Sequence, residues 1–207
     1  MNKKRIVTLL MAGVLTLGVV GGTFAWFTSQ DTVTNSFETL GNNGGDHRGD
    51  IEIGEEFDND GAKKLLPGDE CTKEVWVSNV ADYHQFIRVS LQKSIGPNSS
   101  KEVDLALIEL NMLNVGNSSG QWVKGEDKDK NGNDWYYYIE AVSAGSATKD
   151  ILKSVTFNFN AEDSYKNIDF DVIVNAESVQ AKNGAYKEVW KDAGDTVKGL
   201  LETAQIK

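Results

Sequence analysis

The chain has few of the residues that covalent cross-links and common active sites require. It contains one cysteine, two prolines and two histidines among 207 residues. A single cysteine excludes an intrachain disulfide, so the fold has to be held by its core or by neighbouring molecules. His47 and His84 stand outside any His-Glu-x-x-His motif, and two histidines supply too few ligands for a catalytic zinc site. The sequence therefore predicts a protein that is not an enzyme.

Basic residues are scarce beside acidic ones. The chain has 21 Lys and Arg against 31 Asp and Glu, which gives a formal net charge of −10. Nucleic-acid binding needs clustered Lys and Arg, so we expect no nucleic-acid partner. The lone Cys71 follows Asp69 and Glu70, and neighbouring acids disfavour a thiolate. We interpret it as a half-buried small residue, with an intermolecular disulfide as the alternative.

The N-terminus has the pattern of an export signal. Lys3-Lys4-Arg5 precedes an apolar block over residues 6–20, and Thr23-Phe24-Ala25 has the small-x-small form of a cleavage site. Residues 1–25 are therefore predicted to be a signal peptide cut between Ala25 and Trp26. The block is short for a spanning helix, which needs about 20 apolar residues. A retained membrane anchor is the alternative, because Trp26 and Phe27 extend the apolar stretch.

Residues 26–40 are predicted to form an extended arm. They are rich in Thr, Val and Phe, and they offer the apolar anchors Trp26, Phe27, Val33 and Phe37. The Gly-rich residues 41–50 are predicted to be a flexible loop, which contains the integrin-type tripeptide Arg48-Gly49-Asp50. With no hairpin partner evident in the sequence, the arm suits addition to the exposed sheet edge of a neighbour. Pairing within its own sheet, or disorder, is the alternative.

The rest of the chain reads as short strands and one helical tail. Leu66-Pro67-Gly68-Asp69 predicts a type II turn, and residues 99–107 predict a short capped helix. Residues 186–207 repeat apolar residues every three or four positions and predict an amphipathic helix. Residues 51–185 predict an all-β antiparallel sandwich of jelly-roll or immunoglobulin-like type. The expected strands cover residues 73–79, 86–92, 108–115, 121–124, 134–139, 151–159 and 168–176.

One loop resembles part of a calcium site. Asp127, Asp129 and Asn131 occupy positions 1, 3 and 5 of a calcium loop, and Gly132 occupies position 6. The twelfth position is Tyr138 rather than a bidentate Glu. An Asn-Gly hairpin tip explains the same residues without a metal. We therefore expect no cofactor, with calcium at these three residues as the alternative.

Three local features carry a family resemblance. Residues 21–27 end the export signal and lead into the arm, Leu66-Pro67-Gly68-Asp69 leads into a strand, and residues 169–176 form a strand followed by Glu177-Ser178-Val179-Gln180-Ala181. The hairpin with Trp122 and Trp135-Tyr136-Tyr137-Tyr138 is similar to hairpins of related exported proteins. Together these features resemble the TasA and camelysin family of Gram-positive bacteria.

The resemblance implies both a fold and a role. It implies a β-sandwich, export through a SipW-type signal peptidase, and a secreted subunit of biofilm-matrix or cell-surface fibres. The expected partners are further copies joined head to tail by donor-strand exchange, the signal peptidase, and accessory matrix proteins. Two alternatives remain: a secreted metallopeptidase, as camelysin-type proteins have been classed, and a monomeric surface adhesin or binding module.

Overall fold

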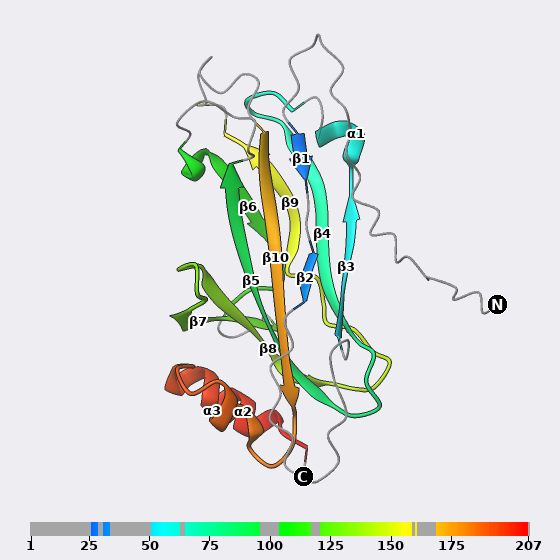
Figure 1. The fold of residues 1–207 in the computed structure, drawn as a ribbon, viewed down its shortest axis with the longest axis vertical. Coiled ribbons are helices and arrows are strands. Elements are labelled where there is room, and N and C mark those ends of the chain that lie inside the picture. The colour runs from blue at the N-terminus through cyan, green and yellow to red at the C-terminus, as the bar shows by residue number, and fades with distance from the viewer. Residues whose placement is uncertain are drawn as a thin grey trace, which may run out of the picture.

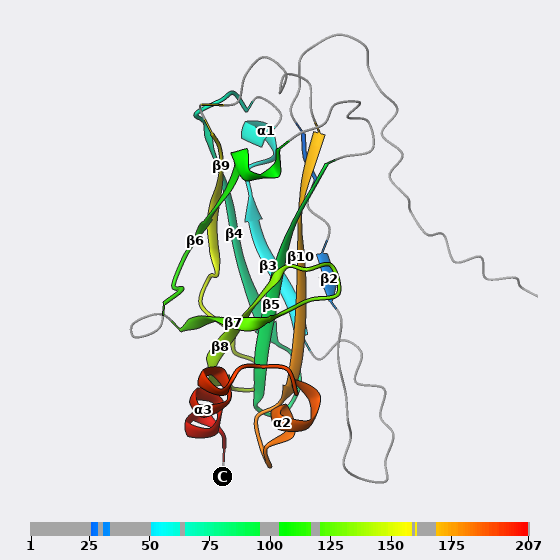
Figure 2. The same ribbon diagram turned by 90° about the vertical axis from the view of Figure 1, so that its left-hand side faces the viewer.

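The computed structural model describes residues 26–28, 31–33, 51–62, 65–95, 104–116, 121–158, 160 and 169–206. These residues form a sandwich of two β-sheets with helices at its ends (Figures 1 and 2). The predicted signal peptide, the 41–50 loop and the anchor Phe37 lie outside the described residues. Within the described part, no helix has the length and apolar character needed to cross a bilayer.

The larger sheet, here called sheet A, has six strands. Its path runs β1-β10-β5-β8-β7, and β2 pairs with β10 on the same side as β1. All of its pairings are antiparallel except those of β1 and β2, which run parallel to β10. The bounds are β1 Trp26–Thr28, β2 Asp31–Val33, β5 Gln85–Ile95, β7 Trp122–Lys128, β8 Asp134–Val142 and β10 Asp169–Gln180.

The smaller sheet, sheet B, has four antiparallel strands in the order β3-β4-β9-β6. Its strands are β3 Ile51–Phe57, β4 Glu70–Asn79, β6 Ile108–Met112 and β9 Leu152–Phe157. Alternate residues of both sheets point into one shared core, as period-2 patterning requires. Val75 and Val77 of sheet B and Phe170 and Val174 of sheet A are at most 1% exposed. The all-β sandwich prediction is confirmed.

Two local predictions hold with small changes. Asp69 donates its backbone N–H to the Leu66 carbonyl, and Gly68 has φ 96°, as a type II turn requires at its third position. The short helix is the 3₁₀ turn Leu105–Leu107, capped by the Asp104 side chain. The short helix α1, Asn59–Ala62, lies between β3 and β4 of sheet B in the chain.

The tail is two helices, so the prediction of one continuous helix is wrong. Helix α2 spans Ala185–Val189 and α3 spans Asp195–Ala204. The break comes at Trp190, which is 1% exposed because it turns into a second core on the outer face of sheet A. Ala193 then donates to the Trp190 carbonyl, and Gly194 precedes the first turn of α3. Figures 1 and 2 show both helices at the end of the sandwich away from α1.

Candidate functional site

The arm pairs with the edge of β10. Trp26 faces Asp169 and Thr28 faces Asp171, while Asp31 faces Val174 in the same parallel register. Both pieces share one offset, since 169 − 26 and 174 − 31 both equal 143. β1 and β2 are therefore in register as two pieces of a single strand position beside β10 (Figure 1).

This pairing within the arm's own sheet is the alternative that stood beside addition to a neighbour's sheet edge. Three predicted anchors, Trp26, Phe27 and Val33, all lie on the edge of β10 in the parent molecule. The sequence could not show this, because a parallel pairing joins residues 143 positions apart and leaves no hairpin signal. The physical reason for the pairing is that β10 would otherwise present unpaired backbone groups along this edge.

The acceptor strand is itself firmly built into the core. Phe170, Val172, Val174 and Ala176 of β10 are between 0 and 1% exposed. Along its other edge, β10 pairs with β5 from Phe170 to Gln180. What β10 offers an added strand is therefore a fixed row of backbone donors and acceptors, which is the requirement for β-augmentation.

The arm lies at the seam between the two sheets. β2 is in contact with β3, the edge strand of sheet B, as well as paired with β10 of sheet A. Close to this seam, β3 and β4 hold an ion pair between Glu55 Oε2 and Lys73 Nζ at 2.5 Å. The Lys73 side chain is 1% exposed, and its ammonium lies 5.0 Å from the centre of the Phe57 ring.

The opposite seam is closed in a different way. Residues 113–121 connect β6 of sheet B to β7 of sheet A, and Val115 forms a bridge with Trp122. Trp122 is fully buried, and its Nε1–H donates to the Lys149 carbonyl at 2.8 Å. Here one large buried side chain of sheet A bonds to the segment that leads into β9 of sheet B.

The predicted calcium residues bind protein groups instead. Asp127 accepts from Arg88 at 3.2 Å, Asp129 accepts from Ser90 at 2.8 Å, and the Asn131 amide donates to Gln92 at 2.8 Å. Alternate loop residues thus meet alternate residues of β5, because both follow the two-residue period of extended chain. Among the described residues, no group of three or more His, Cys, Asp or Glu side chains is placed to hold a metal ion. The three side chains therefore bond to β5 in this structure, and calcium binding at them stays a prediction.

Arg88 is the centre of a half-buried polar cluster on the outer face of sheet A. Its guanidinium donates to Glu177 Oε2 at 2.6 Å and to Tyr137 Oη at 2.9 Å, besides its contact with Asp127. It also stacks 4.1 Å above the Trp135 ring and lies 5.1 Å from Trp190 of the tail. Burial is the main cause that raises the pKa of Tyr137. Sequence reasoning missed this cluster, although an arginine facing outward between apolar positions of β5 was a visible signal.

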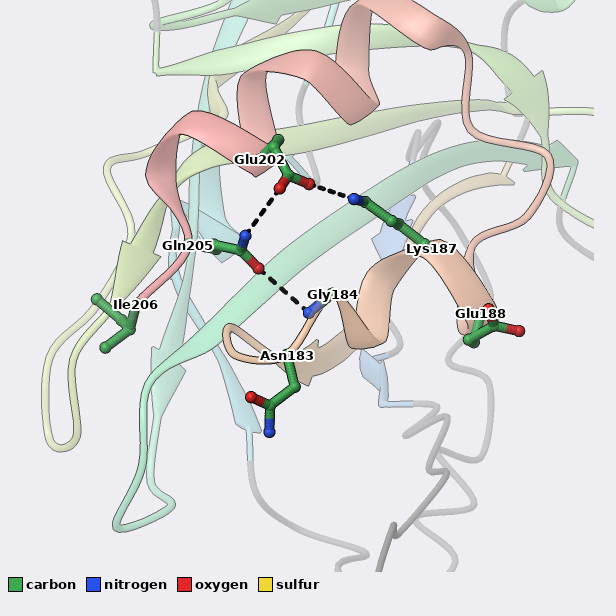
Figure 3. Close-up of a pocket in the computed structure, with 7 residues that line it drawn as sticks. All are labelled: Asn183, Gly184, Lys187, Glu188, Glu202, Gln205 and Ile206. Atoms are coloured by element: carbon green, nitrogen blue, oxygen red, sulfur yellow. Dashed lines mark hydrogen bonds and ion pairs between the residues drawn. The ribbon is translucent and has the colours of Figure 1, made fainter.

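Two hollows flank this outer face. The wider one, of about 430 Å³, lies between α2 and α3, where Lys187 and Glu202 form an ion pair and the Gln205 side chain bridges Glu202 to the Gly184 N–H (Figure 3). The smaller, of about 200 Å³, lies between the tip of the β7–β8 hairpin and β10.

The remaining candidate residues are placed as follows. Cys71 is buried, its thiol lies 3.4 Å from the Asp58 carbonyl, and burial together with Asp58 raises its pKa to about 11. An intermolecular disulfide would require this side chain to leave the core. His84 precedes β5 and receives the Ala181 N–H on its backbone carbonyl. His47 and Arg48-Gly49-Asp50 lie outside the described residues.

Comparisons with known proteins do not show a family for this chain. No family model matches the chain, and no curated protein matches it. One solved structure, carbohydrate-binding module CBM3b from the cellulosomal cellobiohydrolase 9A of Clostridium thermocellum, aligns with a TM-score of 0.28 at 11% identity. The alignment covers 52% of this chain and 70% of the module. The resemblance to the TasA and camelysin family remains a prediction from the sequence.

Proposed function

We propose that this protein is a secreted structural subunit that polymerises when the arm of one copy replaces the arm of another on the edge of β10. Export and cleavage between Ala25 and Trp26, by a SipW-type signal peptidase, would release the arm at its N-terminal end. The observation that carries the proposal is the parallel pairing of residues 26–33 with β10 in a single register. The same backbone contacts are available to an identical arm from a second copy.

Replacement of the parent arm by the arm of a second copy is expected to be a nearly balanced equilibrium. Because the in-chain and between-chain arms are identical, the interactions that exchange breaks are the same as those it forms. The arm is tethered to β3 by residues 34–50, which are 17 residues and span at most about 60 Å when extended. A short tether gives the parent arm an effective concentration in the millimolar range. Dilute protein should therefore stay monomeric, and crowding at the cell surface should favour exchange.

The expected product is an open filament. Each copy gives one arm and receives one, so the contact is head to tail and does not close unless the rotation happens to form a ring. Cleavage after Ala25 removes Lys3, Lys4 and Arg5, which leaves 18 basic against 31 acidic residues and a net charge of −13. This charge opposes close approach of copies, so salt should promote assembly by screening the repulsion. Such a filament fits a place in the matrix or on the cell surface of a Gram-positive bacterium.

A cysteine pair across the arm and β10 tests the proposal. Thr28→Cys and Asp171→Cys occupy partner positions, and neighbouring strands lie about 4.8 Å apart, within disulfide reach. The buried Cys71 is changed to Ser in this background. Oxidation of dilute monomer should lock the arm in its parent and block assembly, and reduction should restore it. Oxidation after assembly should give a ladder of covalently joined chains on a non-reducing gel.

Several results would overturn the proposal. Assembled material whose disulfides all lie within single chains would show that arms do not exchange. Filaments from a variant lacking residues 26–38 would show the same. If neither form makes filaments at any concentration, the binding-module alternative becomes the better description. Stoichiometric zinc with a peptidase activity lost on changing His47 or His84 would favour the metallopeptidase alternative. Single-cysteine variants at residues 28 and 171 are the matched controls.

A further inference from the structure

A hollow of about 200 Å³ lies on the outer face of sheet A. The hairpin tip forms one wall and β10 forms the other, with Trp135 between them. Its lining side chains are Arg88, Lys128, Asp129, Lys130, Trp135, Asn175 and Glu177. A site of this size is below the ~300–1,000 Å³ typical of drug-sized ligands, so it has room for one small ring.

Much of the lining is already occupied by internal contacts. Arg88 is bound by Glu177 Oε2 and Asp127, and Lys128 pairs with Asp134. Asp129 accepts from Ser90 and from the Asn131 and Asn133 N–H groups. These contacts fix the walls in place, so the hollow is formed before any ligand arrives.

Three polar groups remain for a ligand. Within the part of the chain that the structure describes, Lys130 Nζ, Asn175 Oδ1 and Glu177 Oε1 have no hydrogen-bonding partner. One is a donor and two are acceptors. A ligand that both donates and accepts hydrogen bonds, such as a molecule with several hydroxyl groups, matches this set.

The charges of the lining residues also bear on the class of ligand. Arg88, Lys128 and Lys130 are cationic, while Asp129 and Glu177 are anionic. Arg88, Lys128 and Asp129 already have internal partners, which leaves one ammonium and one carboxylate oxygen, so the lining favours neither an anion nor a cation strongly over a neutral molecule. The indole of Trp135 is only 5% exposed and lies under the Arg88 guanidinium, which is 4.1 Å from the ring, so the floor offers little apolar surface. A compact neutral molecule that carries several hydroxyl groups, such as a sugar ring, fits a hollow with this polar lining.

We propose that this hollow binds one neutral sugar ring, a hexopyranose unit of an extracellular glycan. Hydroxyl groups of the ring donate to Asn175 Oδ1 and Glu177 Oε1, and another accepts from Lys130. The hollow borders the arm, because Asn175 is paired with Thr32 of β2. A subunit with such a site would attach glycan to the assembly of which it forms part.

The test is saturation-transfer NMR on the full chain with neutral methyl glycosides of glucose, galactose and N-acetylglucosamine as probes. At least one should give transfer, with a dissociation constant on the order of millimolar, as expected for so few contacts. Asn175→Ala and Lys130→Met should each weaken binding about tenfold by removing one hydrogen bond. Asn160→Ala and Lys153→Met, at exposed positions beyond and within β9 of the other sheet, are matched controls that should leave it unchanged.

The charged analogues glucuronate and glucosamine complete the experiment. Neither should bind more tightly than the neutral glycoside of the same ring. No transfer from any neutral probe at about 20 mM would overturn the proposal, as would tighter binding of either charged analogue. Equal binding by the Asn175→Ala and Lys130→Met variants would place the ligand elsewhere. Unchanged circular dichroism of the variants separates loss of hydrogen bonds to the ligand from loss of fold.

Discussion

The two seams of the sandwich are closed by unlike means. On one side, Val115 forms a bridge with Trp122, and the buried Trp122 indole donates to the Lys149 carbonyl. On the other side, the arm is paired only along β10 and is tethered by the 17 residues 34–50. Exchange at the first seam would displace the buried Trp122. Under the proposed function, exchange at the second seam moves one strand.

The largest effect is expected from Trp122→Ala at the fixed seam. The substitution removes a fully buried indole and leaves the Lys149 carbonyl without its donor. It should lower the free energy of unfolding by about 3–5 kcal/mol. Urea unfolding monitored by circular dichroism measures this. A loss under about 1 kcal/mol would mean that this seam is no firmer than the arm seam.

Arg88→Met should come second. The substitution leaves the Asp127 and Glu177 carboxylates, 7% and 16% exposed, without their cation. It also removes the contact through which Arg88 joins Glu177 of β10 to Asp127 of the β7–β8 hairpin. Removing one partner of a buried pair costs about 3 kcal/mol. The same denaturation experiment applies, with Lys153→Met, an exposed ion-pair residue, as the control that should change little. Equal effects of the two variants would contradict a structural role for the cluster.

Deleting residues 26–33 should have a smaller effect on stability and a complete effect on assembly. The described contacts of the arm are backbone pairings, each worth a net of about 0.5–1.5 kcal/mol before the cost of ordering the arm. We expect a loss of about 1–2 kcal/mol, and no filaments by electron microscopy. Faster hydrogen exchange should be confined to the β10 amides. Exchange that speeds up equally in β7 and β8 would mean that the arm supports the whole sheet.

Lys73→Met should change stability by less than about 1 kcal/mol in either direction. The buried ammonium is replaced by an apolar chain of similar length, while Glu55 is 24% exposed and can turn toward water. Thermal unfolding at two ionic strengths is the measurement. A loss above about 3 kcal/mol would show that this ion pair holds β3 to β4 beside the arm.

The smallest effect is expected from acid. At Asp129 burial raises the pKa, but hydrogen bonds from Asn133, Ser90 and Asn131 outweigh it, so the pKa lies below 3.8. Hydrogen bonds from Lys124 and Lys128 likewise lower the pKa of Asp134. A lowered carboxyl pKa stabilises the fold above its ordinary value and loses this contribution as pH falls through the folded value. Below about pH 4 the hairpin tip should loosen before the Trp122 seam, as residue-resolved NMR can detect.

Local chemistry in the sequence was enough for much of the sheet structure. Alternation gave the strands around Val75, Val89, Phe157 and Val174, and Pro67-Gly68 gave a turn with the expected hydrogen bond. The tail was recognised as helical, yet its break was not. Trp190 leaves the helix to pack in a core that contains residues of β8, which are distant in the sequence. The spacing of apolar residues along the tail carries no information about such a distant contact.

The candidate sites were harder to predict from the sequence than the strands. The 127, 129 and 131 spacing is shared by calcium loops and by any extended segment lying along a strand, so the same pattern fits both outcomes. The partners of these residues, Arg88, Ser90 and Gln92, lie 39 positions earlier in the chain. The hollow beside Lys130 also depends on Glu177 from the far end of the sequence.

By itself, the sequence determined that the protein is a β-sandwich with a helical end, because strand and helix periods are set by neighbouring residues. Only the tertiary structure decided where the arm pairs and which residues of β5 the acidic loop contacts. Each of these depends on backbone or side-chain partners that are remote in the chain, and it is folding that brings them together.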